Sequence, residues 1–313
     1  MAASPRMVVL RALNLGDLLV IVPALRALRR AFPDHEITLA THGWLAPLVE
    51  PIGAVDRLEP TQGLSPLPGP PRADVVVNLH GVAAESNPVL DALRPSRRIG
   101  HAAPGWPGPP WRPGGHERHR WCDLLVAHGI PAEPDDLLLH PPSVAPPVPG
   151  ATVVHVGAGY GAKQWPVERF AAVAAQLHRE GHDVVLTGSA KERPRALAVA
   201  AAAGLPSGAV LAGETGLGEL TALIASARLL VSGDTGAGHL ASAYRTPSVV
   251  LFGPAPIEEW GPPEREPHRA LTVAELRRGD PFAAEPDPAL LGVGVPDVLA
   301  AVTDVLAARP MRS

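Results

Sequence analysis

The chain has 313 residues, of which 46% are hydrophobic and 19% charged, a composition typical of a protein that folds around a core. Its length exceeds that of a typical single domain and predicts two domains. The formal net charge of −4 gives no sign of general nucleic-acid binding. Cys122 is the only cysteine, which excludes an internal disulfide and any zinc site made of several cysteines.

The location of the protein is predicted from its first residues and its cysteine content. Residues 1–11 read as a strand and lack the layout of a signal peptide, and the apolar run 18–25 is too short to span a bilayer. A single cysteine suits a reducing compartment. We therefore expect a cytoplasmic protein whose membrane contact, if it has any, is peripheral, at the inner face of the plasma membrane.

The first half of the chain alternates strand-like and helix-like segments. Apolar runs predict strands at residues 7–11, 36–40 and 74–79 and a short strand that ends at Ile99, with helices at 18–31 and 44–50. Pro23 predicts a kink or a late start in the longer helix. Strands that alternate with helices are typical of an open parallel α/β sheet.

The proline-rich run 141–149 predicts a stiff linker, after which the same pattern begins again. Strands are expected at 152–156, 183–187, 210–211, 229–231 and 248–251, helices beginning near 166, 191, 217 and 235, and a C-terminal helix at 296–308. We predict an N-terminal domain of residues 1–146 and a C-terminal domain of residues 147–313. Two such α/β halves place the expected ligand site in a cleft between them.

A polar turn, Asn14-Leu15-Gly16-Asp17, follows the first predicted strand. Ligands of open α/β sheets bind at the carboxyl ends of the strands, so Asp17 could serve as a general base. An aspartate at the start of a helix can equally cap it, and for Asp17 taken alone the cap is the favoured interpretation.

The second half opens with a glycine-rich loop after a strand. Gly157, Gly159 and Ala162 match the dinucleotide-binding pattern G-x-G-x-x-G/A, but the next predicted strand ends at 187–189 without a carboxylate to hold a ribose. Lys163 also stands where the helix of that pattern should already be running. A phosphate loop, in which Lys163 supplies positive charge, is the better interpretation, and the alternative is a solvated lysine in a turn.

A second glycine-rich turn links the apolar run 228–231 to a helix. Asp234 stands at the expected N-cap, and the N–H groups of Thr235 and Gly236 would point out of the helix start, which favours an anion. His239 lies one turn further on. An ordinary capped helix with a surface histidine is the alternative.

One more carboxylate lies at a strand end. Glu214 could hold a ribose hydroxyl or an adenine amine, or could serve as a helix-start carboxylate. The sequence has no Asp-x-Asp pair and no histidine and cysteine cluster with metal spacing, so we expect no metal site and no cofactor beyond a substrate.

Taken together, these motifs resemble the heptosyltransferases of glycosyltransferase family 9. The resemblance runs from Val8 to about Pro263 and rests on four motifs in order: Leu15-Gly16-Asp17; His155-x-Gly157-Ala158 with Lys163-x-Trp165-Pro166; Asp234-Thr235-Gly236 with His239; and Phe252-Gly253-Pro254 with Trp260-Gly261-Pro262. It implies the GT-B fold, with two Rossmann-like domains facing a cleft and the C-terminal helix returning toward the first domain. It also implies inverting, metal-independent transfer of a sugar from a nucleotide-diphosphate donor, typically ADP-heptose.

The resemblance assigns roles to individual residues. Asp17 would deprotonate the acceptor hydroxyl. Lys163 and the N–H groups at Thr235 and Gly236 would neutralise the leaving diphosphate, and Asp234 would bind donor sugar hydroxyls. The remaining donor-side residues would be Gly157, Gly159, Glu214 and His239.

The acceptor side departs from the lipopolysaccharide core enzymes, since its loops are rich in proline, tryptophan and histidine. Asn14, Arg97, Arg98 and Arg120 are the candidates for acceptor binding, and the basic cluster around them could meet an anionic glycolipid or membrane surface, or could be a solvated face. The expected acceptor is a hydroxyl of a glycan or glycolipid. A GT-B-like sugar-nucleotide epimerase and an inactive nucleotide-sugar-binding module remain as alternatives.

Overall fold

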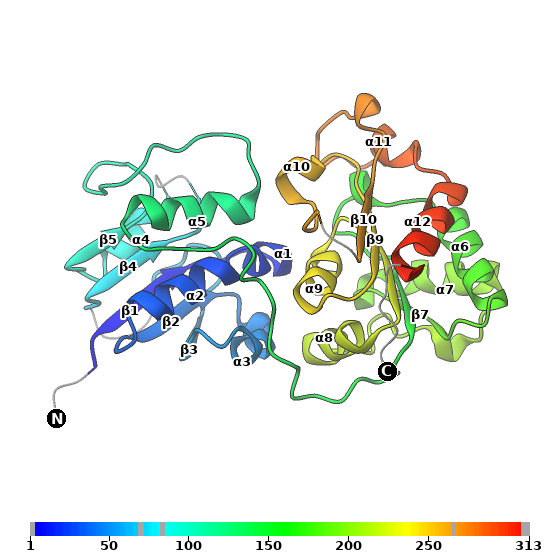
Figure 1. Ribbon diagram of the computed structural model, residues 1–313, viewed down its shortest axis with the longest axis horizontal. Helices are drawn as coiled ribbons and strands as arrows, with labels where there is room; N and C mark the ends of the chain where they lie inside the picture. The colour runs from blue at the N-terminus through cyan, green and yellow to red at the C-terminus, as the bar shows by residue number, and fades with distance from the viewer. Residues whose placement is uncertain (1–3, 68–71, 82–84, 265–266, 308–313) are drawn as a thin grey trace. The chain divides into compact units, whose positions relative to one another are not determined.

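The computed structural model describes residues 4–67, 72–81, 85–264 and 267–307. The chain divides into two compact units, Met1–His140 and Pro141–Ser313, and the proline-rich run 141–149 begins the second. Each unit is a parallel β-sheet with helices on its two faces (Figure 1). The roles that the sequence assigns to the two domains stay predictions.

The sheet of the first unit has five strands in the order β3-β2-β1-β4-β5. Their bounds are β1 Arg6–Leu10, β2 Glu36–Thr41, β3 Arg57–Pro60, β4 Val75–Asn78 and β5 Arg97–Ile99. All neighbouring strands are parallel, and β1 pairs with β2 on one side and β4 on the other. The chain therefore reverses its direction of travel across the sheet between β1 and β4, and such a switch point is where ligands of open α/β sheets bind.

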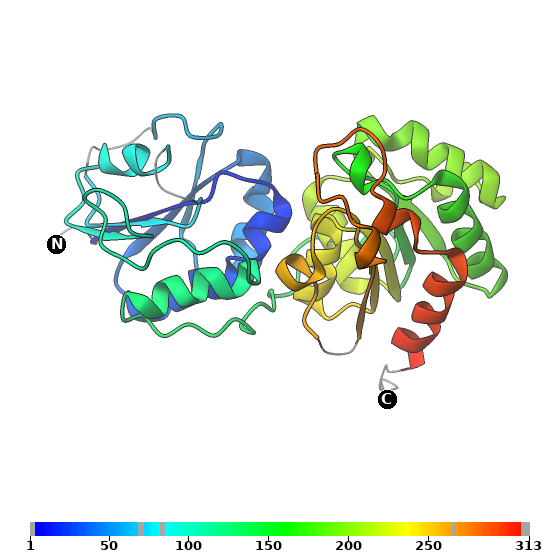
Figure 2. The same ribbon diagram turned by 90° about the horizontal axis from the view of Figure 1, so that it is seen from above.

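Helices cover both faces of this sheet: α1 Leu15–Leu19, α2 Val22–Ala31, η1 Gly43–Leu48, α3 Val49–Ile52, α4 Asn87–Asp91 and α5 Glu117–Ala127. Helices α2 and α5 pack together on one face, and α4 lies on the other (Figures 1 and 2). The predicted helix 18–31 is split in two. Pro23 lies in the first turn of α2, where its missing N–H breaks no helical hydrogen bond, as the expected late start requires.

The sheet of the second unit has the order β10-β9-β8-β6-β7. Its strands are β6 Thr152–His155, β7 Val184–Thr187, β8 Leu229–Gly233, β9 Ser248–Leu251 and β10 His268–Leu271. The predicted strand 210–211 is wrong, because Val210 forms only an isolated bridge with Leu186 beside β7. A 3₁₀ turn, η4 Ser207–Ala209, precedes this bridge, and Gly213 turns the chain away at a positive φ of 76°, so no room is left for a ladder.

Helices α6 Val167–Arg179, α7 Arg193–Ala203 and α12 Val295–Ala307 cover one face of this sheet, and α8 Leu217–Ser226 and α9 Gly236–Tyr244 cover the other (Figure 1). The shorter helices are η2 Gly161–Lys163, η3 Ala190–Glu192, α10 Ile257–Trp260, η5 Ala274–Leu276 and α11 Pro288–Leu291. Helix α12 buries residues at helical spacing, Val298, Ala301, Val302 and Val305. Ala308, the last residue of the predicted helix, lies outside the described residues.

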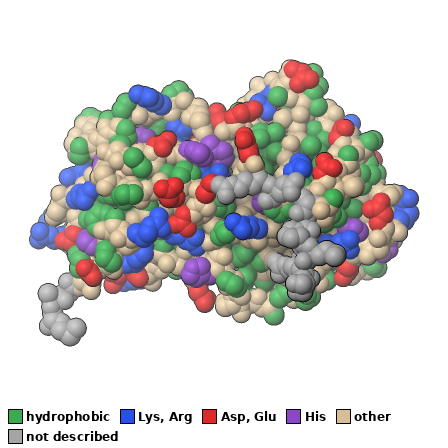
Figure 3. All heavy atoms as spheres, in the orientation of Figure 1, with side chains coloured by type: hydrophobic (Ala, Val, Ile, Leu, Met, Phe, Trp, Pro, Cys, Tyr) green, Lys and Arg blue, Asp and Glu red, His purple; other side chains and the backbone are tan. Residues whose placement is uncertain are grey.

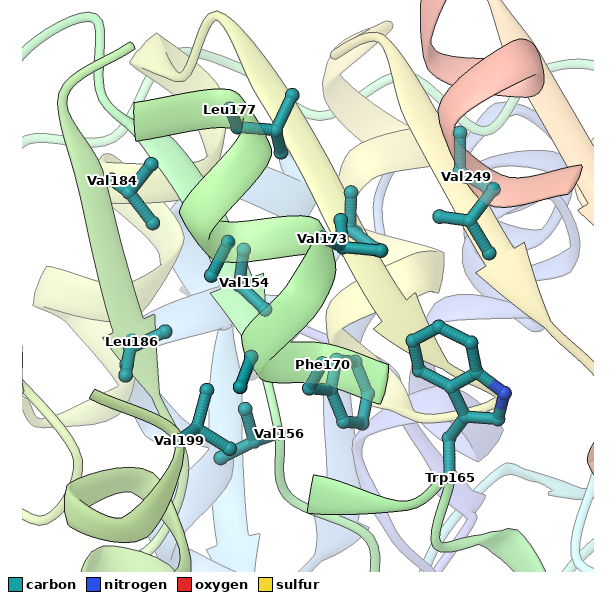
Figure 4. Close-up of a cluster of buried hydrophobic side chains, with 14 of the residues drawn as sticks. Val154, Val156, Trp165, Phe170, Val173, Leu177, Val184, Leu186, Val199 and Val249 are labelled. Atoms are coloured by element: carbon teal, nitrogen blue, oxygen red, sulfur yellow. The ribbon is translucent and has the colours of Figure 1, made fainter. Parts of the chain in front are cut away.

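The core under α6 sets the position of the loop that precedes it. Trp165 is fully buried at the end of this loop, and its ring meets Phe170 of α6 edge to face, with 5.0 Å between centroids (Figure 4). Its indole N–H donates to the carbonyl of Val293 at 3.0 Å. Because a large buried ring cannot move without opening the core, the loop before α6 has a fixed end.

Charged side chains of both signs are interspersed on the surface shown in Figure 3. Within the described ranges, no helix combines the length and the apolar composition needed to cross a membrane.

Candidate functional site

The motifs of the second half meet at the switch point of their sheet. Strands β6 and β8 are neighbours in that sheet, and each is followed by one of the two glycine-rich segments. The loop 156–166 leaves β6, and the turn 234–235 leaves β8 and begins α9. Segments separated in the sequence by about 70 residues are thus brought to one edge of the sheet, where parallel strands present their carboxyl ends.

Lys163 and Asp234 form an ion pair across this edge. The ammonium Nζ of Lys163 lies 2.6 Å from Oδ2 of Asp234, and the side chain of Asp234 is only 7% exposed whereas that of Lys163 is 24% exposed. The two residues were predicted to bind the same ligand separately, and the structure places them in contact with each other. The carboxylate holds the lysine at the mouth of the turn, from which its remaining N–H donors are partly open to solvent.

The start of α9 carries an unpaired polar group. The N-cap is Thr235 rather than the predicted Asp234, because Thr235 has the extended backbone of a cap and the helix begins at Gly236. Its side chain makes no capping hydrogen bond, and Oγ1 of Thr235 is buried without a partner among the described residues. A buried hydroxyl that lacks a partner at a helix N-terminus, beside a lysine ammonium, is the chemistry of an anion site.

A small pocket opens beside this helix start. Asp234, Thr235 and His239 line it, together with Phe252 and Trp260 of the segment after β9. The rings of His239 and Trp260 lie 6.3 Å apart, centroid to centroid. Gly238 packs closely here, since a Cβ at this position would approach a methyl group of Val250 to 3.1 Å.

The glycines of the loop 157–163 accommodate other parts of the protein. A Cβ on Gly157 would lie 2.3 Å from the carboxylate of Glu192, and one on Gly161 would collide with the carbonyl of Ala284. The N–H of Ala162 donates to the carbonyl of Ala283 at 2.9 Å, so the segment between η5 and α11 supports this loop. Gly159, by contrast, has open space where its Cβ would be, which leaves the backbone there accessible.

Two cations beneath the loops are absent from the sequence prediction. Arg195 of α7 donates from Nε to the carbonyl of Val156 at 3.1 Å and from Nη2 to that of Trp165, so it ties both ends of the loop 156–165. Arg193 donates to the carbonyl of Ala212 at 2.8 Å and pairs with Glu214 at 2.8 Å. Arginines that satisfy loop carbonyls have no periodic signal in a sequence, because their partners lie far along the chain.

Glu214 and His155 lie at the same sheet edge, and both side chains already have partners in the protein. The side chain of Glu214 is 55% exposed and pairs with Arg193. Nδ1 of His155 lies 2.9 Å from the hydroxyl of Thr187. Burial lowers the pKa of His155, and the negative charge of Glu192 opposes this shift only in part. His155 is therefore neutral at neutral pH.

In the first unit, Asp17 lies at the carboxyl end of β1, in the first turn of α1. Its Oδ2 accepts the backbone N–H of Asn14 at 3.2 Å, and its Oδ1 accepts from Nη2 of Arg11 at 3.0 Å. The side chain of Asp17 keeps 22% of its surface exposed. Both interpretations given from the sequence are therefore open to this residue, since it caps the helix start and still presents its carboxylate to solvent.

Arg11 organises this site and was not predicted to belong to it. Its side chain is 2% exposed, and Nη1 donates to the carbonyl of Leu79 at 2.6 Å. The guanidinium lies over the ring of Trp121, 4.8 Å from its centroid, and 3.8 Å from Glu117 of α5. Burial lowers the pKa of Arg11, and the charges of Asp17 and Glu117 oppose that shift. The signal for this role in the sequence was the position of Arg11, a charged residue directly after the apolar run of β1.

His80 lies at the end of the neighbouring strand β4. Its Nδ1 accepts the backbone N–H of Ala12 at 3.2 Å, which places the ring proton of the neutral form on Nε2. Burial, followed by the charge of Arg11, lowers the pKa of His80, and Asp17 opposes the shift. Nε2 makes no hydrogen bond within the part of the chain that the structure describes, and it is not among the buried unpaired atoms. It therefore presents a donor at the same sheet edge as Asp17.

The three arginines predicted for the acceptor side have protein partners. Arg97 lies over the ring of Phe32, 5.4 Å from its centroid, and Nε of Arg98 pairs with Asp91 at 2.7 Å. Nε of Arg120 pairs with Glu117 at 2.7 Å, its Nη atoms donate to the carbonyls of Arg112 and Gly114, and its guanidinium covers Trp111. Of the three, Arg97 has the most exposed side chain and no carboxylate partner among the described residues.

The described residues contain no group of three or more His, Cys, Asp or Glu side chains that could hold a metal ion. The expectation of a reaction without metal is not tested by this finding and stays a prediction.

Comparison with known proteins gives one family. Residues 146–275 match the model of glycosyltransferase family 9 (heptosyltransferase). The chain is similar to lipopolysaccharide heptosyltransferase 2 of Escherichia coli K12, with 37% identity over 132 residues that make up 40% of this chain and 38% of the relative. It is also similar to lipopolysaccharide heptosyltransferase 1 of Pseudomonas aeruginosa, with 39% identity over 110 residues, 35% of this chain and 30% of the relative. The matches thus span less than two fifths of these relatives.

Solved structures match over nearly the whole chain. A family 9 glycosyl transferase from Veillonella parvula has a TM-score of 0.78 at 20% identity and covers 97% of this chain and 98% of that structure. The ADP-heptose lipopolysaccharide heptosyltransferase II of E. coli has a TM-score of 0.74 at 21% identity and covers 96% and 98%. At these identities the likeness shows the fold, and the predicted GT-B class with its two Rossmann-like units is confirmed.

Proposed function

We propose that this chain is a glycosyltransferase that moves a heptose from ADP-heptose to a hydroxyl of a glycan or glycolipid acceptor, because its residues 146–275 match the model of glycosyltransferase family 9 (heptosyltransferase). The family match and the relatives' names support the reaction class and the donor. The acceptor is proposed to belong to the lipopolysaccharide type that those names state.

The observation that carries the proposal is the unsatisfied start of α9. The buried, unpaired hydroxyl of Thr235 and the ammonium of Lys163 lie at the end of neighbouring strands, and an ADP diphosphate would satisfy both. Asp234 would orient Lys163 and accept hydrogen bonds from the donor sugar. Gly236, His239, Gly159 and, at the edge, Gly157 and Glu214 complete the proposed donor side.

The proposed base is Asp17, in the first unit. Its exposed carboxylate would take the proton of the acceptor hydroxyl as that oxygen attacks the anomeric carbon of the donor from the face opposite the diphosphate, with inversion. Arg11 would hold the carboxylate in place, and Nε2–H of His80 would donate to an acceptor oxygen. Asn14, Arg97, Arg98 and Arg120 stay the acceptor-side candidates.

The proposed reaction uses no metal. The developing charge on the leaving ADP would be stabilised by Lys163 and by the N–H groups at the start of α9, which aim positive charge at the bond that breaks. The donor sugar nucleotide is the substrate, and no further cofactor is proposed. The proposed location is the cytoplasm, with peripheral contact at the inner face of the plasma membrane.

The arrangement disfavours the epimerase alternative. An epimerase needs acid and base groups beside the donor sugar, yet Nδ1 of His155 is engaged by the hydroxyl of Thr187, and Glu214 is paired with Arg193. The inactive binding module differs from the enzyme in having no turnover, and Asp17 with its supporting Arg11 gives no reason to expect that loss.

A thermal-shift titration tests the donor first. The protein is titrated with ADP, UDP, GDP, dTDP and NAD, each with and without Mg²⁺. We expect ADP to raise the melting temperature without Mg²⁺, because a ligand at a hundred times its Kd stabilises a fold by about 2.7 kcal/mol. ADP release from ADP-heptose is then measured with a heptose-deficient lipopolysaccharide acceptor. A response to NAD alone, or none to any nucleotide, would overturn the proposal.

A further inference from the structure

A hollow in the first unit lies between the loop 109–115 and helix α5, and Asp17 is not among the residues that line it. It has a volume of about 270 Å³, and its walls include His101 and Pro109 on one side and His119 and Leu124 of α5 on the other. All of the residues that line it belong to the first unit. Of the residues that line it, the proposed function names Arg120 alone, as an acceptor-side candidate.

The buried polar atom of this pocket is a hydrogen-bond acceptor. Nδ1 of His101 lies 3.3 Å from the carbonyl of Pro109, and a carbonyl can only accept, so Nδ1 carries the proton. Burial lowers the pKa of His101, and the ring is neutral with a lone pair on Nε2. The residue is 7% exposed, and Nε2 has no partner among the described residues. Such an orphaned acceptor costs stability unless a donor reaches it.

One of the cations that line the pocket already has partners in the protein. Arg120 lines the pocket, but Nε is paired with Glu117, both Nη atoms donate to loop carbonyls, and its face covers Trp111. An anion in the pocket would therefore meet the lone pair of His101 without gaining the charge of Arg120. A ligand with hydroxyl donors suits this wall better. The ring of Trp111 packs edge-on against that of His101, with 4.9 Å between their centroids, and keeps the His101 ring in place.

We propose that this pocket is a subsite for an uncharged, hydroxyl-rich sugar ring, which donates a hydroxyl to Nε2 of His101. The proposal rests on the proposed function, since it assigns the ring to the acceptor glycan. The pocket would hold a sugar of the acceptor other than the one that reacts. Because the lone pair on Nε2 of His101 accepts a hydrogen bond, we expect this atom to favour a sugar hydroxyl over phosphate or carboxylate.

Direct binding to the whole protein tests this. The protein is labelled with ¹⁵N-histidine and titrated with methyl α-D-mannopyranoside and, separately, with inorganic phosphate, while long-range ¹H–¹⁵N spectra follow the ring nitrogens. We expect a saturable shift of the His101 Nε2 resonance with the glycoside and none with phosphate. A shift with phosphate alone would make the pocket an anion site, and no shift with either would also overturn the proposal.

Two matched variants locate the binding. His119 and Val126 both have exposed side chains on α5, but only His119 lines the pocket. His119→Trp should fill the mouth and abolish glycoside binding, whereas Val126→Trp should leave it unchanged. His101→Asn keeps a donor for Pro109 and removes the acceptor, so we expect affinity to fall about fivefold to tenfold. Equal affinity in the His119 and Val126 variants would refute the location.

ADP binding is measured on the same samples by calorimetry. If the protein binds ADP but does not bind the glycoside, this proposal is refuted and the proposed function stands. The reverse result would sink the proposed function and leave a sugar-binding pocket.

Discussion

The ion pair between Lys163 and Asp234 makes an unusually specific prediction about Lys163→Met. In this variant the carboxylate of Asp234, with 7% of its side chain exposed, loses the cation that lies 2.6 Å away. A buried charge without a partner destabilises the fold, and here it would also repel an incoming diphosphate. We therefore expect the variant to lose both stability and affinity for ADP.

The two losses have different sizes. Removing one partner of a buried pair costs about 3–5 kcal/mol, and the partial exposure of Lys163 reduces this to about 2–3 kcal/mol. For a unit of this size the melting temperature should fall by about 4–12 °C. Loss of a charge-assisted hydrogen bond to the diphosphate, about 1.5–3 kcal/mol, should weaken ADP binding by about 10- to 150-fold.

The assay compares Lys163→Met with the double variant Lys163→Met/Asp234→Asn. Urea unfolding gives the stability, and calorimetric titration with ADP gives the affinity. The double variant has no unpaired charge, so stability should return while ADP affinity stays low. ADP carries no donor sugar, so the proposed contact of Asp234 with that sugar does not confuse the readout. ADP affinity at the wild-type level in Lys163→Met would refute the phosphate role.

Further expectations concern the first unit and the pH response. Asp17→Asn keeps an acceptor for the Asn14 N–H, so transfer should fall by about 10²- to 10⁴-fold in kcat while ADP affinity stays within a few-fold, and near wild-type turnover would exclude Asp17 as the base. His80→Asn keeps the acceptor for the Ala12 N–H but lacks the Nε2–H donor, whereas His80→Gln keeps that donor and lacks the acceptor. The Asn variant should therefore lose about tenfold more transfer activity than the Gln variant. Equal losses would indicate a structural role. Burial lowers the pKa of His268 to about 4, so the folded state binds fewer protons than the unfolded state between pH 4 and 6.5 and its stability falls as the pH drops through that window. Urea unfolding at pH 7 and pH 5 should therefore show a loss about 2 kcal/mol larger in the wild type than in His268→Asn, and identical losses would disprove the assignment.

The sequence predicted the fold well where the signal was local. Apolar runs bounded by proline and glycine located most strands, and Pro23 located the break between α1 and α2. The run at 210–211 looked like a strand for the same reason, yet neighbouring turns leave Val210 a single bridge. Strands β3 and β10 were missed because Arg57, Glu59 and His268 interrupt their apolar pattern.

The candidate site was predictable in its motifs and not in its contacts. Glycines and charges at strand ends indicated where Lys163, Asp234 and Thr235 would meet, because parallel strands end at one edge. Their mutual pairing, and the position of the N-cap, depend on side-chain packing that no spacing encodes. The roles of Arg11 and His80 also depend on contacts between distant parts of the chain. Arg11 donates to the carbonyl of Leu79, and His80 accepts the N–H of Ala12.

The contact between Gly161 and Ala284 sets a limit on how this protein can be divided for engineering. The family match ends at residue 275, but the loop that carries Lys163 is held by the carbonyl of Ala283, and Trp165 by that of Val293. A chimaera that exchanged only residues 146–275 would place the loop of one protein against the supporting segment 283–293 of another. An exchange that runs from the linker through α12 keeps the loop and its support together, and is the unit in which donor preference should be transplanted.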